Sequence, residues 1–296
     1  MKKRVGIVCI AMICLSCLAY FYLHNDKKES ESKEDVYLKT VVFKDKEDEL
    51  IPISVNFHSQ VELEEDVINR IDLMKSSDMV SYGLYPIFSE DLTVQSAEVK
   101  NNILTIDFND ELYTNQDAMD ILEALTFTMT DYDDVNRLQL TINGKEIAYL
   151  PNSDIPVSSL TQSLGLNNFE ETSALLHETH PVMVYNEKVI NQYSYYVPTT
   201  IRVDENESIQ KQVQTILNYI SSKIHLVEAS LEKNVLTIEL DSNILLDNEK
   251  IDQKLEDLIV LSLSSIPNVD DVKILVNGED ARSKKTSEMQ YNYIKI

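Results

Sequence analysis

The sequence predicts an α+β protein made of two tandem duplicated domains, each a small sheet with two helices, behind an N-terminal membrane anchor. Three observations favour this class: an internal repeat, hydrophobic periodicities that alternate between strand-like and helix-like within each copy, and one long apolar segment near the start. The chain has 296 residues, which suits two domains of roughly 100–200 residues each. Each copy is expected to have an αββαβ core with extra strands. The predicted parts are a membrane anchor (1–24), a charged linker (25–36), a first domain (37–150), an inter-domain linker (151–181), a second domain (182–280) and a C-terminal tail (281–296).

The repeat is defined by two pairs of matching stretches. Asn102–Asp107 (NILTID) matches Asn234–Glu239 (NVLTIE), and Leu138–Gly144 (LQLTING) matches Val272–Gly278 (VKILVNG). The copies are more than about 100 residues apart, so the repeating unit is a whole domain and not the short module of a solenoid.

Both copies contain an Asn-Gly pair at the same place, Asn143-Gly144 in the first and Asn277-Gly278 in the second. A type I′ hairpin turn needs positive φ at both central residues, and Asn-Gly is the pair that favours it most. These four residues are therefore predicted to be structural markers of the repeat.

The elements of the first copy follow from the spacing of its apolar residues. Alternation predicts strands, and apolar residues three and four apart predict helices with an acidic first turn. The predicted strands are 38–43, 51–57, 94–99, 103–108, 138–142 and 146–149, and the predicted helices are 63–75 and 115–130.

The second copy is predicted to repeat this order, with Ser208 as the N-cap of its first helix. In the inter-domain linker, Leu160, Leu164 and Leu166 have the spacing of one short helix.

The N-terminus indicates export. Lys2-Lys3-Arg4 precedes the uncharged segment Val5–Leu23, whose helical length of roughly 28 Å is close to the thickness of a bilayer core. Basic residues before the segment keep that end in the cytoplasm and place the bulk of the chain outside the membrane. Two interpretations remain open: an uncleaved single-pass anchor, or a lipoprotein attached through Cys17.

Composition excludes several classes of function. The three cysteines, Cys9, Cys14 and Cys17, lie in the apolar segment, so no disulfide, thiolate nucleophile or Cys-based metal site is expected outside it. With 50 acidic and 26 basic residues, the chain is not expected to bind nucleic acid. Its 5 glycines form no phosphate-binding loop, and no cofactor is predicted.

Candidate chemical motifs fit their templates poorly. His177-Glu178-Thr179-His180 is one residue short of the H-E-x-x-H zinc pattern and is followed by Pro181. Asp131–Asp134 and Asp270-Asp271 do not follow a calcium loop, so weak calcium binding stays an alternative to a solvated loop. No catalytic or metal site is predicted. Asp107 and Glu239, at equivalent strand ends, are expected to be structural.

Tyrosines gather at the start of the second copy, where strands are expected. Such a cluster suits an interface, since aromatic side chains are enriched there, and it suits ordinary strand propensity equally well. The residues are Tyr185, Tyr193, Tyr195 and Tyr196.

The order of strands, helix and V-x-x-L-x-L-x-I-N-G motif resembles the GerM domain family of bacterial sporulation and spore-germination proteins. The resemblance covers residues 85–108 and 135–147 of the first copy and 225–240 and 269–280 of the second, which lacks the proline before its first hairpin. It implies an anchored, extracytoplasmic, non-catalytic protein whose units resemble the ring-building modules of the channel between mother cell and forespore. The implied partners are other sporulation envelope proteins or further copies of the chain. The alternatives are an anchored module that binds calcium, peptide or a wall ligand and, with least support, an enzyme acting on the cell wall.

Overall fold

A computed structural model describes residues 37–57, 61–114, 117–132, 134–158, 160–167, 178–246, 250–282 and 292–294. The predicted anchor, the charged linker and Cys17 lie outside these residues. Among the helices that the structure does describe, none has the length and apolar character needed to cross a bilayer. The predicted α+β class is confirmed. Contacts divide the chain into residues 1–38 with 56–60 and residues 39–55 with 61–296, and the interactions discussed below lie within the second of these units.

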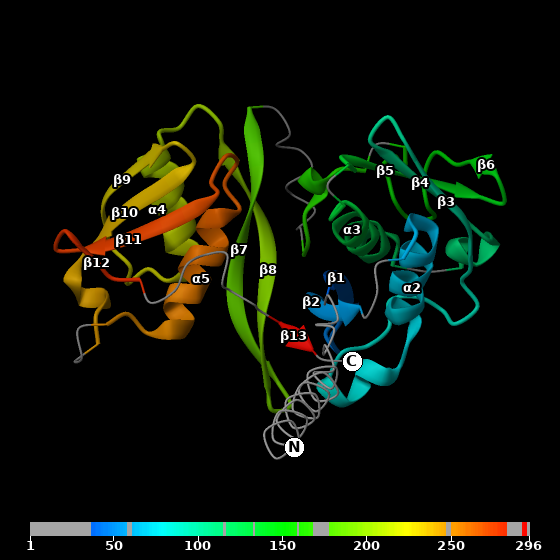
Figure 1. Ribbon diagram of the computed structural model, residues 1–296, viewed down its shortest axis with the longest axis horizontal. Helices are drawn as coiled ribbons and strands as arrows, with labels where there is room; N and C mark the ends of the chain where they lie inside the picture. Colours follow the sequence, from blue (N-terminus) through cyan, green and yellow to red (C-terminus); the bar gives the residue numbers. More distant parts are fainter. Residues whose placement is uncertain are drawn as a thin grey trace, which may run out of the picture. The chain divides into compact units, whose positions relative to one another are not determined.

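The first copy begins with a hairpin and continues as a four-stranded sheet with two helices (Figure 1). Strands β4 and β5 are parallel and joined through α3, whereas β3 and β6 pair antiparallel at the two edges, giving the order β3-β4-β5-β6. The elements are β1 (Tyr37–Lys44), β2 (Leu50–Phe57), α2 (Leu63–Lys75), the 3₁₀ turns η1 (Asp78–Tyr82) and η2 (Asp110–Tyr113), β3 (Val94–Lys100), β4 (Ile103–Phe108), α3 (Ala118–Met129), β5 (Arg137–Ile142) and β6 (Lys145–Glu146).

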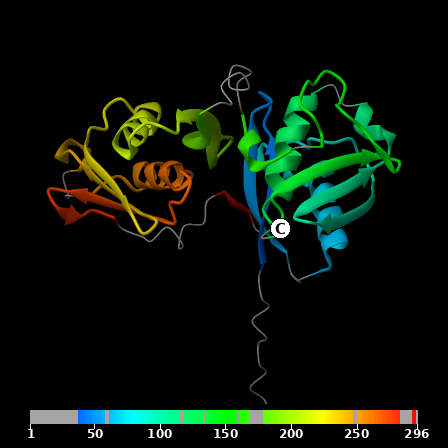
Figure 2. The ribbon, with the colours of Figure 1, turned by 90° about the horizontal axis from the view of Figure 1, so that it is seen from above.

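The second copy has the same order of elements and the equivalent sheet, β12-β11-β10-β9. Figure 2 shows α4 and α5 on one side of this sheet. Its elements are β7 (Thr179–Ile190), β8 (Tyr193–Asp204), α4 (Ile209–Ile220), β9 (Leu226–Glu232), β10 (Val235–Leu240), η5 (Ser242–Ile244), α5 (Gln253–Ser264), β11 (Asp271–Val276) and β12 (Glu279–Asp280).

Each sheet buries one face because its strands alternate apolar and polar residues. In β10, Leu236, Ile238 and Leu240 are buried, and the intervening Thr237 and Glu239 are half-exposed. The buried face packs with the apolar stripes of the helices into one continuous core, to which α4 contributes Val213, Ile216 and Leu217.

Several predictions differ from the structure, among them the strand 146–149, of which only Glu146 lies in a strand, β6. The leucines of the inter-domain linker form no α-helix among residues 160–167: Leu160 bridges to Leu138, and only the 3₁₀ turn η3 (Gln162–Leu164) follows. Ser208 is the N-cap of α4, as predicted, although its side chain makes no capping hydrogen bond. Strand β7 begins at Thr179, inside the predicted linker. The predicted tail contains the short strand β13 (Tyr293–Ile294).

Candidate functional site

The long hairpin β7–β8 starts the second copy, and its two strands pair antiparallel from Thr179 to Ile190. Helix α5 covers the outer edge of β7: the backbone N–H groups of Met183 and Tyr185 donate to the hydroxyls of Ser265 and Ser262, each at 2.9 Å. Unpaired strand edges tend to pair with other strands, and the two serine hydroxyls accept hydrogen bonds from two N–H groups of the β7 edge. The hairpin is therefore fixed to its own copy.

Strand β8 is bound on its other side by residues outside the second copy. The Asn167 side chain donates to the carbonyls of Pro198 and Leu50, both at 2.8 Å, and accepts the Leu50 N–H. Thr200 Oγ1 accepts the N–H of Leu166 at 2.9 Å. These bonds connect β8 to strand β2 of the first copy through the end of the linker.

A four-membered ionic cluster makes a second connection. Lys188 of β7 lies 2.5 Å from Asp45, 2.6 Å from Glu49 and 3.0 Å from Glu47, all in the β1–β2 turn. Burial alone would raise the pKa of Asp45, but hydrogen bonds from Lys188 and from the backbone N–H groups of Glu47 and Glu49 outweigh it and lower that pKa. The same carboxylates raise the pKa of Lys188 against the opposing effect of its burial. Both pKa shifts favour the charged forms of Asp45 and Lys188, and this cluster joins the two copies.

The tyrosine cluster makes the third connection. The Tyr195 hydroxyl donates to the Tyr82 carbonyl at 2.9 Å, and the rings of Tyr82 and Tyr193 lie 4.9 Å apart. Burial raises the pKa of Tyr195 to about 12. Tyr196 instead donates to Asp257 of α5 at 3.0 Å. Tyr193 and Tyr195 of the hairpin therefore contact the first copy, and Tyr196 contacts helix α5 of the second copy. These tyrosines serve an interface inside the chain.

The four repeat markers occupy equivalent turns. Positive φ values occur at Asn143 (50°), Gly144 (71°), Asn277 (54°) and Gly278 (78°), as a type I′ turn requires. Gly144 N–H donates to Asp107 at 2.8 Å and Gly278 N–H donates to Glu239 at 3.0 Å. The two strand-end carboxylates thus hold the turns, and the structure does not bring them together into one site.

The other candidate residues are dispersed. His180 lies in β7 opposite Val203, His177 lies outside the described residues, and Asp270 accepts from Asn234 at 2.9 Å. Among the residues that the structure describes, no group of three or more His, Cys, Asp or Glu side chains is arranged to hold a metal ion.

A buried cation in the first copy was not predicted from the sequence. Arg70 of α2 is fully buried; it donates to Asp66 at 3.1 Å and to the Thr128 carbonyl at 2.8 Å, and its guanidinium lies 4.5 Å from the Tyr132 ring. Asp131 lies 3.6 Å from the same guanidinium. The sequence feature that could have indicated this cation is an arginine among the apolar residues of one helix face. The cluster ties α2 to the end of α3, so its role is structural.

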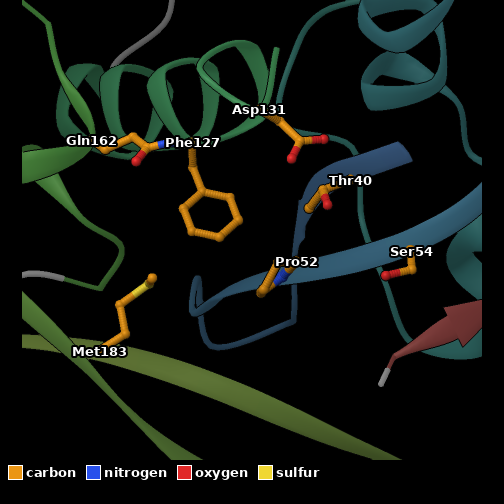
Figure 3. A pocket seen from close by; sticks show the side chains of 7 residues that line it. All are labelled: Thr40, Pro52, Ser54, Phe127, Asp131, Gln162 and Met183. Atoms are coloured by element: carbon orange, nitrogen blue, oxygen red, sulfur yellow. The ribbon is translucent and has the colours of Figure 1, made fainter. Parts of the chain in front are cut away.

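A pocket of about 190 Å³ lies beside the hairpin β1–β2. Figure 3 shows the Phe127 ring pointing into it from α3, with Met183 on the opposite side. Its polar groups are hydroxyls, one amide and one carboxylate, a lining suited to a small ligand with polar and apolar parts. The lining residues are Thr40, Pro52, Ser54, Phe127, Asp131, Gln162 and Met183.

Comparison with known proteins gives concordant results. The sequence model of the Germane family, described as sporulation and spore germination, matches residues 20–148 and 182–282. The spore germination protein GerM of Bacillus subtilis is 27% identical over 225 residues, a match that covers 69% of this chain. The matched region spans 61% of that relative's length.

One solved structure supports the fold. The tandem GerMN domains of the sporulation protein GerM from Bacillus subtilis match with a TM-score of 0.69 at 22% identity, covering 83% of this chain and 92% of that one. The first GerMN domain alone covers 43% of this chain and 98% of its own, with 19% identity and a TM-score of 0.36. Because the family model covers most of both copies, the chain belongs to the Germane family of sporulation and spore germination.

Proposed function

We propose that this chain is a non-catalytic, membrane-anchored, extracytoplasmic assembly component of the sporulation envelope, acting between mother cell and forespore. The observation that carries the proposal is a family-typical pair of domains joined through one hairpin. A chain with two copies of one domain presents two similar surfaces, which suits repeated docking in a ring or scaffold.

The charge of the chain sets a condition on self-association. Its formal net charge is −24, so like copies repel one another unless their contacts bury few carboxylates or include a basic partner. Salt screens surface charges beyond about 10 Å at 0.1 M. Self-association is therefore expected to strengthen with moderate salt.

Mass photometry of the full-length chain in detergent tests the assembly role. Discrete oligomers that grow with protein concentration support it, and their abundance is expected to rise between low and moderate salt. An immunoblot across growth tests the biological assignment. Constitutive presence in vegetative cells without a rise at sporulation would contradict it.

A second candidate is an anchored module that binds calcium, a peptide or a wall ligand, and the mixed polar and apolar lining of the pocket favours the peptide or wall ligand. If this candidate is correct, millimolar calcium or wall fragments raise the melting temperature of the protein. Gln162→Ala alters the pocket lining and is expected to reduce that rise, whereas Tyr219→Ala, an exposed position on α4, leaves it unchanged. A melting temperature that does not change with any of these ligands would contradict this candidate function.

A further inference from the structure

The C-terminal strand completes a sheet of the first copy. Strand β13 lies parallel to β2, with Tyr293 opposite Ser54 and Ile294 opposite Val55, and gives the sheet order β1-β2-β13 (Figure 1). Ser54 N–H donates to the Asn292 carbonyl at 3.0 Å, and Ile294 is buried. Residues 292–294 thus add to an edge of β2.

Asn292 fixes this added strand through its side chain. Its Nδ2 donates to the carbonyls of Pro52 at 2.8 Å and Tyr196 at 2.7 Å, and its Oδ1 accepts the Tyr196 N–H at 2.7 Å. The residue is buried and has a left-handed φ of 52°, a conformation that asparagine tolerates well. The acceptor site, formed by Pro52, Ser54, Val55 and Tyr196, therefore selects an asparagine followed at the second position by a buried apolar side chain.

Strand β13 is short, and its pairing with β2 is limited. It shares two register pairs with β2, and its Tyr293 side chain is 40% exposed. Along the chain it follows residue Arg282 of the second copy after residues 283–291, and it also contacts that copy through the bonds of Asn292 to Tyr196. A short strand of this kind can leave one acceptor site and enter an identical one without forming any new type of bond.

The charge of the C-terminal part of the chain complements the rest. Residues 281–296 contain four basic side chains and one acidic, whereas the whole chain has 26 basic and 50 acidic. This segment is therefore attracted to the acidic body of another copy, and that attraction offsets the mutual repulsion of the two bodies.

We propose that the acceptor site also receives Asn292–Ile294 of a second copy, so that exchange of this strand links copies of the chain. The proposal rests on the assembly role proposed above and names the contact that produces it. The exchanged strand makes the same bonds as the strand of the same chain. The balance between the two forms is consequently set by local concentration, which is high for chains confined to a membrane.

Cysteine cross-linking between two chains tests the exchange. The background is full-length protein with Cys9 and Cys14 changed to alanine; Cys17, the attachment residue of the lipoprotein interpretation, is kept and is present equally in the test and control pairs. One tagged chain carries Ser54→Cys and a second, differently tagged chain carries Tyr293→Cys. The two positions are opposite each other in the parallel register, a separation that suits a disulfide. The chains are co-expressed, oxidised in the membrane and separated without reductant.

A disulfide-linked species that carries both tags is the expected result. The matched control pairs Ser54→Cys with Tyr219→Cys, a position 60% exposed on α4 that reports random collision. The doubly tagged species should exceed this control on the order of tenfold, because a bound strand presents the two thiols at a high effective concentration. Adding Asn292→Ala to the Tyr293→Cys chain should reduce the yield towards the control level.

Two outcomes overturn the proposal. The first is a Ser54→Cys/Tyr293→Cys double variant that closes a disulfide within one chain while the mixed chains give no more product than the control. The second is no cross-link in either arrangement, because the strand then does not occupy the site. If oligomers are still seen in mass photometry under either outcome, the proposed assembly role is retained. The contacts between copies then involve other surfaces.

Discussion

Gly165 should tolerate a side chain poorly, because two separate costs coincide there. Its φ of 77° and ψ of −161° belong to a backbone region that is essentially restricted to glycine, which costs about 1–3 kcal/mol for other residues. A Cβ at this position would lie 2.1 Å from Thr200 Oγ1 and 2.6 Å from Thr200 Cβ. Thr200 is buried in β8 and bonded to Leu166, so it cannot move aside freely, and overpacking adds about 1–3 kcal/mol. Gly165→Ala should therefore lower the free energy of unfolding by about 2–6 kcal/mol.

Gly144→Ala is the matched control. This glycine also has a positive φ, 71°, but a Cβ there would meet nothing within 4 Å. Only the left-handed backbone then contributes, at about 1–2 kcal/mol. Urea unfolding followed by circular dichroism at 222 nm measures both variants. Equal losses in the two variants would contradict the close approach of Gly165 to Thr200 of β8.

Two further predictions concern the ionic cluster and the helix caps. The lowered pKa of Asp45 contributes stability that is present above its unfolded value of about 3.9 and is lost as the pH falls through the folded value. Lys188→Ala should cost roughly 1–3 kcal/mol at neutral pH and flatten the fall in melting temperature on acidification; an unchanged pH profile would contradict the cluster. Asp252→Ala should cost about 0.5–2 kcal/mol because its carboxylate caps α5, whereas Ser208→Ala, with no capping bond, should cost less; calorimetry showing the reverse order would contradict this assignment.

Local patterns predicted the repeated core well. Helix α2 has the predicted bounds, Leu63 to Lys75, because its apolar spacing and acidic first turn are both local signals. The β4 and β10 stretches were recognised because strict alternation and the repeat supported one another. The residues of the Asn-Gly pairs stand in the conformation that the turn type demands.

Long-range contacts were not predictable from local patterns. Strand β7 extends through Pro181, which suggests a break, because β8 supplies a partner at every position. Strand β13 forms because Asn292 finds partners in β2 and β8, far away in the sequence. The spacing of Leu160, Leu164 and Leu166 predicted a short helix, but Leu160 and Leu166 are buried and Leu160 bridges to Leu138, so contacts with other elements decide their conformation. The contacts that join the two copies therefore could not be predicted from the sequence, although the tyrosines that take part in them form a recognisable cluster.

The mass of the native complex isolated from sporulating cells tests the central claim most directly. The chain has a mass of 33.9 kDa, and solubilisation in mild detergent followed by mass photometry with an antibody to the chain would size the particles that contain it. The assembly role predicts particles several times heavier than one chain. Particles of single-chain mass at the stage when the protein is most abundant would contradict it.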